Sequence, residues 1–452
     1  MNKRNVAAVI LAAGHGTRMK SATPKVLHAI GGRSMLAHVM ASASALAPAR
    51  MAVVIGDHSP AVGEAARRER ADAVVAVQAP PRGTGDAVKQ AMPALAGFDG
   101  AVLILYADTP LVTAATLAAL TAKVGAGAAV AVLGFRPAEA GAYGRLKTNM
   151  AGDLEAIVEA KDANAEELAI GFVNSGVMAV DAAFLARALP QLKDDNAKKE
   201  FYLTDIVAIA RREGLSCAVA EAPEDEVLGV NSRVELSEAE AIFQTRRREA
   251  AMAAGVTLID PGSVFFSWDT AIANDVVIEP NVFFGPGVTV AAGANIRANS
   301  HIEGATIGAG ASVGPFARLR PGAALAPHSK VGNFVEIKNA DIGPDAKVPH
   351  LTYVGDASVG AGANLGAGTI TCNYDGFSKH RTTIGEGAFV GSNSALVAPV
   401  TIGAGAYVGS GSVITRNVEP DALAVARGRQ ADFKGWAAKF RALNKVRKKD
   451  QP

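Results

Sequence analysis

Glycines and cations lie close together near the start of the chain, in the stretch LAAGHGTRMKSATPK over residues 11–25. Glycines that follow a strand let backbone amides approach a phosphate, and Arg18 and Lys25 can neutralise charge that develops on it. Neither standard phosphate loop fits, because Met19 stands where both the P-loop and the dinucleotide fingerprint need another glycine. We therefore expect a different kind of polyphosphate loop, with a simple chain turn as the alternative.

A carboxylate follows a later apolar run, in a position that suits a metal ion. Asp108 ends the stretch AVLILYAD, and a hard oxygen donor of this kind is the ligand that Mg²⁺ prefers. The alternative is that Asp108 only caps the helical stretch TPLVTAATLAAL, which follows it directly. Asp108 is therefore a candidate metal ligand, with capping left open.

Residues 1–230 alternate apolar runs with helical stretches, which is the pattern of a doubly wound, Rossmann-like α/β domain. The predicted strands are VAAVILAA, MAVVIG, DAVVAV, AVLILYAD and AAVAVLGF, and SMLAHVMASASAL is a typical helical stretch between them. Continuous apolar runs favour a parallel sheet that is buried on both faces. Such sheets bind ligands at the carboxyl ends of their strands, where the glycine loop and Asp108 both lie.

A single helix is expected to link this domain to the rest of the chain, over residues 231–255. Ser232 and Glu235 match a capping box at its start, and Gly255 can end it. Residues 256–452 then form a second domain with a C-terminal tail.

An aliphatic or aromatic residue recurs every six positions after residue 260, beginning with Ile272, Ile278, Phe284 and Val290. The register slips by one at intervals, is interrupted by TCNYDGFSKHRTT, and returns at Ile384. A period of six sustained over this length is the signature of hexapeptide repeats. In proteins with this repeat, three hexads make one triangular coil, and here about seven coils would stack into a left-handed parallel β-helix.

The composition excludes several classes of protein. The chain has 452 residues, 49% of them apolar, and its 45 Lys and Arg nearly balance its 43 Asp and Glu. A net charge of +2 gives no electrostatic footprint for nucleic acid, and the basic KVRKK run is expected to be a solvated helix end. Cys217 and Cys372 are too few for a disulfide framework or a zinc site, which suits a reducing cytoplasm.

The apolar stretch near the N-terminus is expected to be a strand rather than a signal for export. Val6 to Ala13 is short for the apolar part of a signal peptide, and it runs straight into the glycine turn. No stretch of the sequence is long and apolar enough to span a membrane, so we expect no membrane partner.

The opening LAAGHGTRMKSATPKVLHAIGGRSML resembles the L-A-A-G-x-G-T-R-M…P-K opening of sugar-phosphate nucleotidyltransferases. Joined to a long hexapeptide domain, it resembles the bacterial bifunctional N-acetylglucosamine-1-phosphate uridyltransferase/glucosamine-1-phosphate N-acetyltransferase family over nearly the whole chain. The resemblance implies acetyl transfer from acetyl-CoA to glucosamine 1-phosphate, then uridyl transfer from UTP with release of pyrophosphate. It also implies Mg²⁺ as cofactor, and a cytoplasmic homotrimer with acetyl-transfer sites between the prisms.

In the first domain the resemblance assigns roles to single residues. It implies that Gln78, Gly83 and Thr84 contact uracil, and that Asp108 holds Mg²⁺ together with Asn231. The implied nucleotide- and sugar-binding residues are Leu11, Ala12, Ala13, Gly14, Arg18, Lys25, Gln78, Gly83, Thr84, Tyr106, Asp108, Gly144, Glu159, Asn174 and Asn231, the sugar positions being Gly144, Glu159 and Asn174. Asn174 could also be a simple turn residue.

In the β-helix the resemblance implies that His350 is a general base. An ammonium must lose a proton before it can attack a thioester, and histidine titrates near neutrality. A surface histidine at a corner is the alternative. The implied positions for glucosamine 1-phosphate are Arg320, Lys338, Tyr353 and Asn364, and those for acetyl-CoA are Ala367, Asn373, Tyr374, Ser392, Ser410 and Arg427. Arg320 and Lys338 suit a sugar phosphate, and backbone amides near Ala367 could stabilise the thioester oxyanion.

Three residues depart from the family's pattern, which has glycine, histidine and alanine where this chain has Ala107, Asp86 and Ser410. The methyl group of Ala107 is expected to crowd the nucleotide, and Ser410 to alter the acetyl-CoA contacts. Because none of the three replacements removes a needed charge, we still expect activity.

Two alternatives to the bifunctional enzyme stay open at this point. One is a monofunctional sugar-phosphate nucleotidyltransferase whose β-helix serves only assembly and regulation. The other is a hexapeptide scaffold whose first domain merely binds nucleotide. Lys25 with Asp108 and Asn231 argues against the scaffold, because a binding module has no need of a pair of residues ready for a metal.

Overall fold

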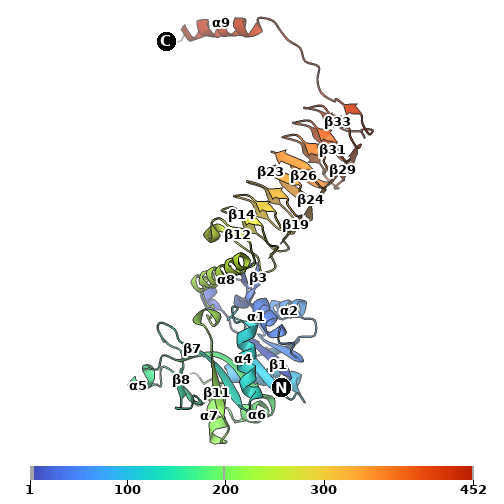
Figure 1. Cartoon of the computed structure of the whole chain (residues 1–452). Helices are drawn as coiled ribbons and strands as arrows, with labels where there is room; N and C mark the ends of the chain where they lie inside the picture. The colour runs from blue at the N-terminus through green and yellow to red at the C-terminus, as the bar shows by residue number, and fades with distance from the viewer. Residues whose placement is uncertain (1–4, 197–198, 450–452) are drawn as a thin grey trace. The chain divides into compact units, whose positions relative to one another are not determined.

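The structure, a computed structural model, describes residues 5–196 and 199–449 (Figure 1). It divides into two units. The first runs to Ala250 and includes Phe266–Trp268, and the second takes Ala251–Phe265 and the chain from Asp269 onward.

A sheet forms the centre of the first unit, in the order β11-β7-β10-β6-β1-β4-β5. Its strands are β1 (Val6–Ala12), β4 (Arg50–Gly56), β5 (Val74–Gln78), β6 (Ala101–Tyr106), β7 (Val130–Phe135), β10 (Val173–Asp181) and β11 (Cys217–Glu221). The five strands expected from the apolar runs are confirmed as β1, β4, β5, β6 and β7. These five strands run in the same direction, as expected, whereas β10, which the apolar runs did not predict, runs antiparallel to both β6 and β7. A hairpin of β8 (Arg145–Thr148) and β9 (Leu154–Val158) extends from β10.

Helices cover both faces of this sheet, as the doubly wound pattern predicts (Figure 1). Alternate residues of β1 enter two separate cores, Ile10 on one face and Val9 on the other. One core receives α1 (Met35–Ser44), α2 (Pro60–Glu69) and α4 (Ala114–Gly125), and the other receives α3 (Thr84–Ala91), α6 (Ala182–Ala188) and α7 (Asp205–Arg212). A short helix, α5 (Ala165–Leu168), follows β9. The apolar runs of β1, β4, β6 and β7 are continuous because both of their sides are buried.

The helix predicted after the first domain is α8 (Arg233–Ala253), and the division between the two units falls within its last turn. The Ser232 hydroxyl accepts from the Glu235 amide at 3.3 Å, as the capping pattern predicts. The Glu235 carboxylate accepts instead from the Asn231 amide at 2.6 Å, one residue earlier than a regular capping box requires. The helix start is therefore tied to Asn231.

The second unit is a parallel β-helix of stacked coils (Figure 1). One sheet contains β12 (Thr257–Leu258), β14 (Val277–Ile278), β17 (Asn295–Ile296), β20 (Ser312–Val313), β23 (Lys330–Asn333), β25 (Lys347–His350), β27 (Asn364–Leu365), β30 (Phe389–Val390), β33 (Tyr407–Val408) and β35 (Leu423–Ala424). A second sheet, with two parallel rows, runs from β13 (Ala271–Ile272) to β34 (Val413–Ile414) through β24 (Glu336–Ile342), β26 (Tyr353–Val359), β28 (Ile370–Cys372) and β29 (Thr382–Ile384).

The hexapeptide period sets the register of these coils. Ile278 pairs in parallel with Ile296, and Ile296 with Val313, so that one coil takes 18 residues and the next 17. Each of these repeated aliphatic residues is 0% exposed, as the inward position requires. The interrupting sequence TCNYDGFSKHRTT runs from the end of β28 to the start of β29, and its middle part, residues 373–381, leaves the coil as a loop. Its exposed carboxylate, Asp375, accepts hydrogen bonds from the amides of Phe377 and Ser378.

A final helix, α9 (Trp436–Lys449), ends the described chain, and the KVRKK run forms its last turns as predicted. None of the helices in the described ranges is long and apolar enough to cross a membrane.

Candidate active sites

The glycine loop after β1 is shaped by its close approach to Lys25. Gly16 has a φ of +63°, and a Cβ there would lie 2.5 Å from the Lys25 Cβ, so glycine is required. Met19 is 1% exposed, which means that it anchors the loop in the core where a standard phosphate loop has glycine. Of the other residues predicted here, Leu11, Ala12 and Ala13 are buried, and Gly14 and Arg18 are exposed.

Three distant segments meet at Lys25. Its Nζ donates to Asp108 Oδ2 at 2.5 Å and to Asn231 Oδ1 at 2.9 Å. The side chains of Lys25 and Asp108 are 11% and 23% exposed, so the ion pair is largely shielded from solvent. A backbone hydrogen bond of 2.8 Å from the Val230 amide to the Asp108 carbonyl holds the two oxygen-bearing segments together.

The two oxygens around Lys25 fit a divalent metal ion. They converge on one cation, and both are hard donors of the type that Mg²⁺ uses. Within residues 5–196 and 199–449, no three or more His, Cys, Asp or Glu side chains are grouped to hold a metal, so the remaining ligands would be water and phosphate oxygens. The alternative that Asp108 only caps the following helix is wrong. Thr113 caps that helix, since its hydroxyl accepts from the Thr116 amide at 3.2 Å.

The segment predicted to contact uracil, residues 83–85, is hydrogen-bonded to residues 201–203. The Gly85 amide donates to the Phe201 carbonyl at 2.8 Å, and the Leu203 amide donates to the Thr84 hydroxyl at 3.1 Å. A Cβ on Gly83 would lie 2.8 Å from the Phe201 carbonyl oxygen, which leaves no room for a side chain. Gln78 lies at the end of β5 and is 3% exposed.

Tyr106 is the last residue of β6, and Ala107 follows it directly. Removal from water, with a smaller contribution from the Asp108 charge, raises the pKa of Tyr106 to about 12, so the phenol stays neutral at physiological pH. A Cβ on Gly176 would lie 2.9 Å from the Tyr106 ring, which shows how closely β10 approaches it. Ala107 is 0% exposed and belongs to a core cluster. Its methyl group therefore packs inside the unit, and the expectation that it crowds the nucleotide was wrong.

The three predicted sugar-binding residues lie together. The Asn174 amide donates to the Gly144 carbonyl at 2.8 Å, and a Cβ on Gly144 would lie 3.5 Å from Glu159 Oε1. Asn174 Oδ1 accepts from the Gly176 amide at 2.8 Å, at the irregularity in β10. Asn174 is thus a turn residue as well as a neighbour of the other two.

In the second unit, cations gather on one row of the β-helix. Arg320 Nη1 donates to Glu336 Oε1 at 2.8 Å, and Glu336 pairs in register with Tyr353 one coil further on. Lys338 lies on the same strand as Glu336, and the nearby ammonium of Lys379 lowers the pKa of Lys338. Two ammonium groups held side by side suit a phosphate, and the Asp356 carboxylate also interacts with both of them.

His350 lies at the end of β25, beside Asn333 of the preceding coil. The His350 Nδ1 and the Asn333 Oδ1 are 2.5 Å apart, and the two residues are register partners. With the amide oxygen as acceptor, Nδ1 carries the proton and Nε2 is left as the basic nitrogen. The His350 ring is exposed, so a substrate can reach it.

The predicted acetyl-CoA residues follow His350 along one corner of the β-helix. The Gly368 amide donates to the His350 carbonyl at 3.3 Å, and the Asn393 amide to the Ala367 carbonyl at 2.8 Å. On later coils the Gly411 amide donates to the Ser392 carbonyl, and Arg427 Nη1 donates to the Ser410 carbonyl at 2.7 Å. The corner residues on these successive coils are His350, Ala367, Ser392, Ser410 and Arg427.

The other predicted residues of this unit lie beside the cationic row or one strand away. Asn373 Nδ2 lies 3.4 Å from the Tyr353 hydroxyl, and it donates to Asp356 Oδ2 at 2.5 Å. The exposed Tyr374 donates to the Gly376 carbonyl within the loop. Asn364 lies on β27, the strand that pairs with β25.

Comparison with known proteins supports both halves of this description. The MobA-like NTP transferase domain matches residues 8–200, and the bacterial transferase hexapeptide (six repeats) matches residues 381–416. A protein from Rhizorhabdus wittichii named "Bifunctional protein GlmU" is 60% identical over 457 residues, covering 99% of each chain. Proteins of the same name from Maricaulis maris and Rhodospirillum rubrum are 58% and 59% identical, covering 98% of each chain and 96% and 97% respectively.

The chain belongs to the GlmU family. The resemblance seen in the sequence is thereby confirmed, as is its fold: a Rossmann-like nucleotidyltransferase unit and a left-handed β-helix of hexapeptide repeats. The relatives are named as bifunctional and match from end to end, so a single transferase with a passive β-helix is not favoured. A solved structure, that of the inositol-1-phosphate CTP transferase from T. maritima, is also similar over 54% of this chain, with 14% identity and a TM-score of 0.44.

The sequence did not predict Asn333 and Lys379, which contact the candidate site residues His350 and Lys338 in this GlmU family member. Asn333 precedes His350 by 17 positions, one coil, so the coil length could have identified it as a neighbour. Lys379 lies in the loop that interrupts the hexads, where the period gives no placement. Only the folded loop brings its ammonium beside Lys338.

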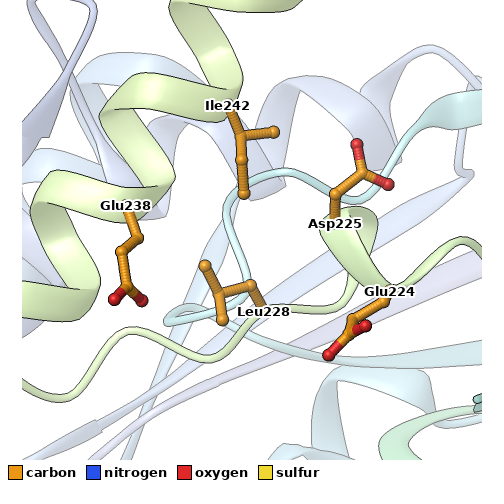
Figure 2. Close-up of a pocket in the computed structure, with 5 residues that line it drawn as sticks. All are labelled: Glu224, Asp225, Leu228, Glu238 and Ile242. Carbon is orange, nitrogen blue, oxygen red and sulfur yellow. The ribbon is translucent and has the colours of Figure 1, made fainter. Parts of the chain in front are cut away.

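The first unit also contains a pocket of about 490 Å³ (Figure 2). Figure 2 shows that it is lined by Glu224, Asp225, Leu228, Glu238 and Ile242. None of these residues was predicted from the family pattern. Asp225 is paired with Arg246 at 2.6 Å, which is a structural use of that carboxylate.

Proposed function

We propose that the chain is a bifunctional transferase that makes UDP-N-acetylglucosamine, the precursor of bacterial wall polymers. Its β-helix transfers acetyl from acetyl-CoA to glucosamine 1-phosphate, and its first unit transfers uridyl from UTP to the N-acetylglucosamine 1-phosphate that results. End-to-end identity of 53–60% with relatives that are named as bifunctional supports this assignment. The observation that carries it is the convergence of Lys25, Asp108 and Asn231 at the carboxyl end of the central strands.

In the uridyl transfer, a phosphate oxygen of the sugar phosphate attacks the α-phosphorus of UTP, and pyrophosphate leaves. Such a transfer needs positioning and charge stabilisation from the protein rather than covalent help. The exposed Arg18 and the partly buried Lys25 lie in the glycine loop and can neutralise the charge that develops on the phosphates. Gly144, Glu159 and Asn174 would hold the sugar.

Asp108 and Asn231 would hold Mg²⁺. Mg²⁺ held by these two residues would supply positive charge that neutralises the UTP phosphates. The fit of the two oxygens around the Lys25 ammonium, at 2.5 and 2.9 Å, supports this role.

In the acetyl transfer, His350 Nε2 takes a proton from the amine of glucosamine 1-phosphate as the nitrogen attacks the thioester carbonyl. The tetrahedral intermediate then expels the thiolate of CoA, which takes up the proton, while amides near Ala367 stabilise the oxyanion. The contact of Asn333 with Nδ1 supports this tautomer. Arg320, Lys338 and Lys379 are the cations available for the sugar phosphate.

We also infer a homotrimer in the cytoplasm. At one corner the left-handed φ positions that hold Asn281 and Asn299 in earlier coils hold Phe316, Phe334 and Leu351 in later coils, all at φ between +49° and +60°. Large apolar side chains are rare in this conformation. These three are 48%, 56% and 61% exposed, which supports a partner surface over them. Both cysteines are free, which suits a reducing compartment.

The decisive experiment supplies glucosamine 1-phosphate, acetyl-CoA, UTP and Mg²⁺ to the purified protein and identifies the products by mass. We expect CoA, pyrophosphate and UDP-N-acetylglucosamine. Replacing glucosamine 1-phosphate with N-acetylglucosamine 1-phosphate tests the second step alone. Pyrophosphate from the second mixture, with no CoA released in the first, would instead indicate a monofunctional nucleotidyltransferase.

A further inference from the structure

The Gln78 amide is held in one orientation by two partners. Its Nε2 donates to the Gly83 carbonyl at 3.0 Å and to Asp86 Oδ2 at 2.8 Å. A backbone carbonyl and an ionised carboxylate only accept hydrogen bonds, so the nitrogen end of the amide must face them. No described residue donates a hydrogen bond to Gln78 Oε1, which is the end left for a ligand.

Asp86 is well placed to act as the stronger of these two partners. It lies in the first turn of α3, where the helix dipole favours a carboxylate. Its hydrogen bond from Gln78 is charge-assisted and shorter than the one to Gly83. Its other oxygen lies 3.5 Å from the Gln90 amide, which is a long contact with an exposed side chain. The family often has histidine at this position, so the arrangement comes from a residue in which this chain departs from the pattern.

We propose that Asp86 is a positioning residue that makes the first unit select uracil over cytosine. It acts through Gln78, whose Oε1 it turns toward the base. Uracil has a donor, N3–H, where cytosine has a lone pair on N3, so a fixed acceptor attracts the first base and repels the second. The proposal rests on the proposed function, from which the contact between Gln78 and the base is taken.

Burial gives this orientation its effect. Gln78 is 3% exposed, so water cannot compensate for a hydrogen-bonding group that is left facing the wrong partner. A site built to bind an N–H group rejects an analogue without it far better than an apolar pocket rejects a change of size. Without Asp86, only the Gly83 carbonyl would hold the nitrogen end, and the amide could turn toward either base.

The test compares UTP with CTP as substrates, by pyrophosphate release at saturating N-acetylglucosamine 1-phosphate. In Asp86→Ala we expect the ratio of kcat/KM for UTP over CTP to fall at least about tenfold. Asp86→Asn keeps an acceptor oxygen without the charge and should retain most of the discrimination. Asp86→Lys offers only donors, which draw Oε1 away from the base, so its ratio should fall at least as far. Gln90→Ala is the matched control and should keep the wild-type ratio.

Each outcome separates this proposal from the proposed function. Wild-type protein that transfers uridyl, with an unchanged ratio in Asp86→Ala and Asp86→Lys, overturns the role of Asp86 alone. If Asp86→Asn loses discrimination as fully as Asp86→Ala, the charge of the carboxylate causes the discrimination, and the proposal that Asp86 acts by orienting the Gln78 amide is wrong. Wild-type protein that transfers neither nucleotide overturns the proposed function. Acetyl transfer in the same preparations, together with circular dichroism, identifies a variant that has lost its fold, in which case the other substitutions at position 86 decide.

Discussion

The Lys25 Nζ lies 2.5 Å from Asp108 Oδ2, so an ammonium occupies the place where the Asp108 and Asn231 oxygens converge. The lysine comes from the segment after β1, Asp108 follows β6, and Asn231 lies two residues before α8. The two kinds of group suit different ligands: the oxygens of Asp108 and Asn231 suit a metal ion, and the ammonium of Lys25 suits a phosphate. Substitutions on the two sides of the pair therefore have different expected effects.

Asp108→Ala should cripple uridyl transfer, by at least about 10²-fold, because the loss of the carboxylate removes the one charged metal ligand. Acetyl transfer should stay at the wild-type rate, since its proposed chemistry needs no metal. The two rates are measured as pyrophosphate and free thiol released by one preparation. Asp99→Ala, at an exposed carboxylate in the same unit, is the control. Normal uridyl transfer in Asp108→Ala would mean that Asp108 holds no metal.

Lys25→Met should also lose uridyl transfer, but it should keep the metal site. The substitution removes the cation that neutralises the phosphates, while both oxygens remain and no longer face a competing ammonium. We expect Mn²⁺, used as a paramagnetic substitute for Mg²⁺, to bind at least as tightly as in wild type when nucleotide is absent. Free Mn²⁺ is measured by electron paramagnetic resonance. Weaker binding, similar to that of Asp108→Ala, would show that Lys25 supports the metal site instead of competing with it.

The sequence predicted the strands well because their signal is local. The runs that form β1, β4, β6 and β7 are buried on both faces, so their composition alone identifies them. In the edge strand β5, Val74 and Val77 are 47% and 49% exposed. The direction of a strand is not a local property. β10, with the sequence VNSGVMAVD, is more polar than β6 and β7, and only its tertiary pairing with them makes it antiparallel. The hexad period, by contrast, predicted the β-helix through its inward residues over many coils.

The family pattern indicated candidate site residues, and the geometry added how they are held. The pattern could not show that Asp86 faces Gln78, because they come from different elements and meet through one side-chain contact. It also suggested that the Ala107 methyl crowds the nucleotide, whereas that methyl lies in the core. Residues one coil apart are the exception, since 17 or 18 positions predict a contact such as that of Asn333 with His350.

His350→Ala should lower the turnover of acetyl transfer by about 10² to 10⁴, the usual cost of removing a general base. Asn333→Ala should lower it less, by up to about 10²-fold, because the imidazole remains but loses the partner that orients it. Acetyl-CoA binding and uridyl transfer should not change in either variant. Thiol release is the measurement for both. A wild-type rate in His350→Ala would make it an ordinary corner histidine.

Cys217 should resist alkylation in the native protein and destabilise it in alkali. Burial raises the pKa of this thiol from 9.0 to about 11, so little thiolate exists near pH 8. Between these two values the unfolded chain has lost its proton while the folded chain keeps it. The free energy of unfolding therefore falls as pH rises from 9.0 to about 11, by up to about 1.4 kcal/mol per pH unit from this group.

Two measurements check the behaviour of Cys217. Iodoacetamide at pH 8, followed by mass spectrometry, should modify the half-buried Cys372 before Cys217. Denaturant unfolding from pH 8 to 11 should show a steeper loss of stability in wild type than in Cys217→Ala. Equal slopes would show that the thiol does not contribute to this loss.

Phe334→Asn should dissociate the proposed trimer without disturbing the coil. Phe334 has a φ of +54°, and asparagine occupies the same corner position at Asn281 and Asn299 with a φ of +60°, so the replacement suits the backbone. The Phe334 ring stacks on that of Phe316 at 5.1 Å, and both are about half exposed in one chain, so the substitution removes apolar surface that a partner would cover. We expect sedimentation velocity to show a shift toward monomer and acetyl transfer to fall with it, because the proposed acetyl sites lie between chains.

Uridyl transfer should be unchanged in Phe334→Asn, and Met150→Asn, at a fully exposed apolar residue of the first unit, should leave the trimer intact. A Phe334→Asn protein that sediments as wild type would place the partner surface elsewhere on the β-helix.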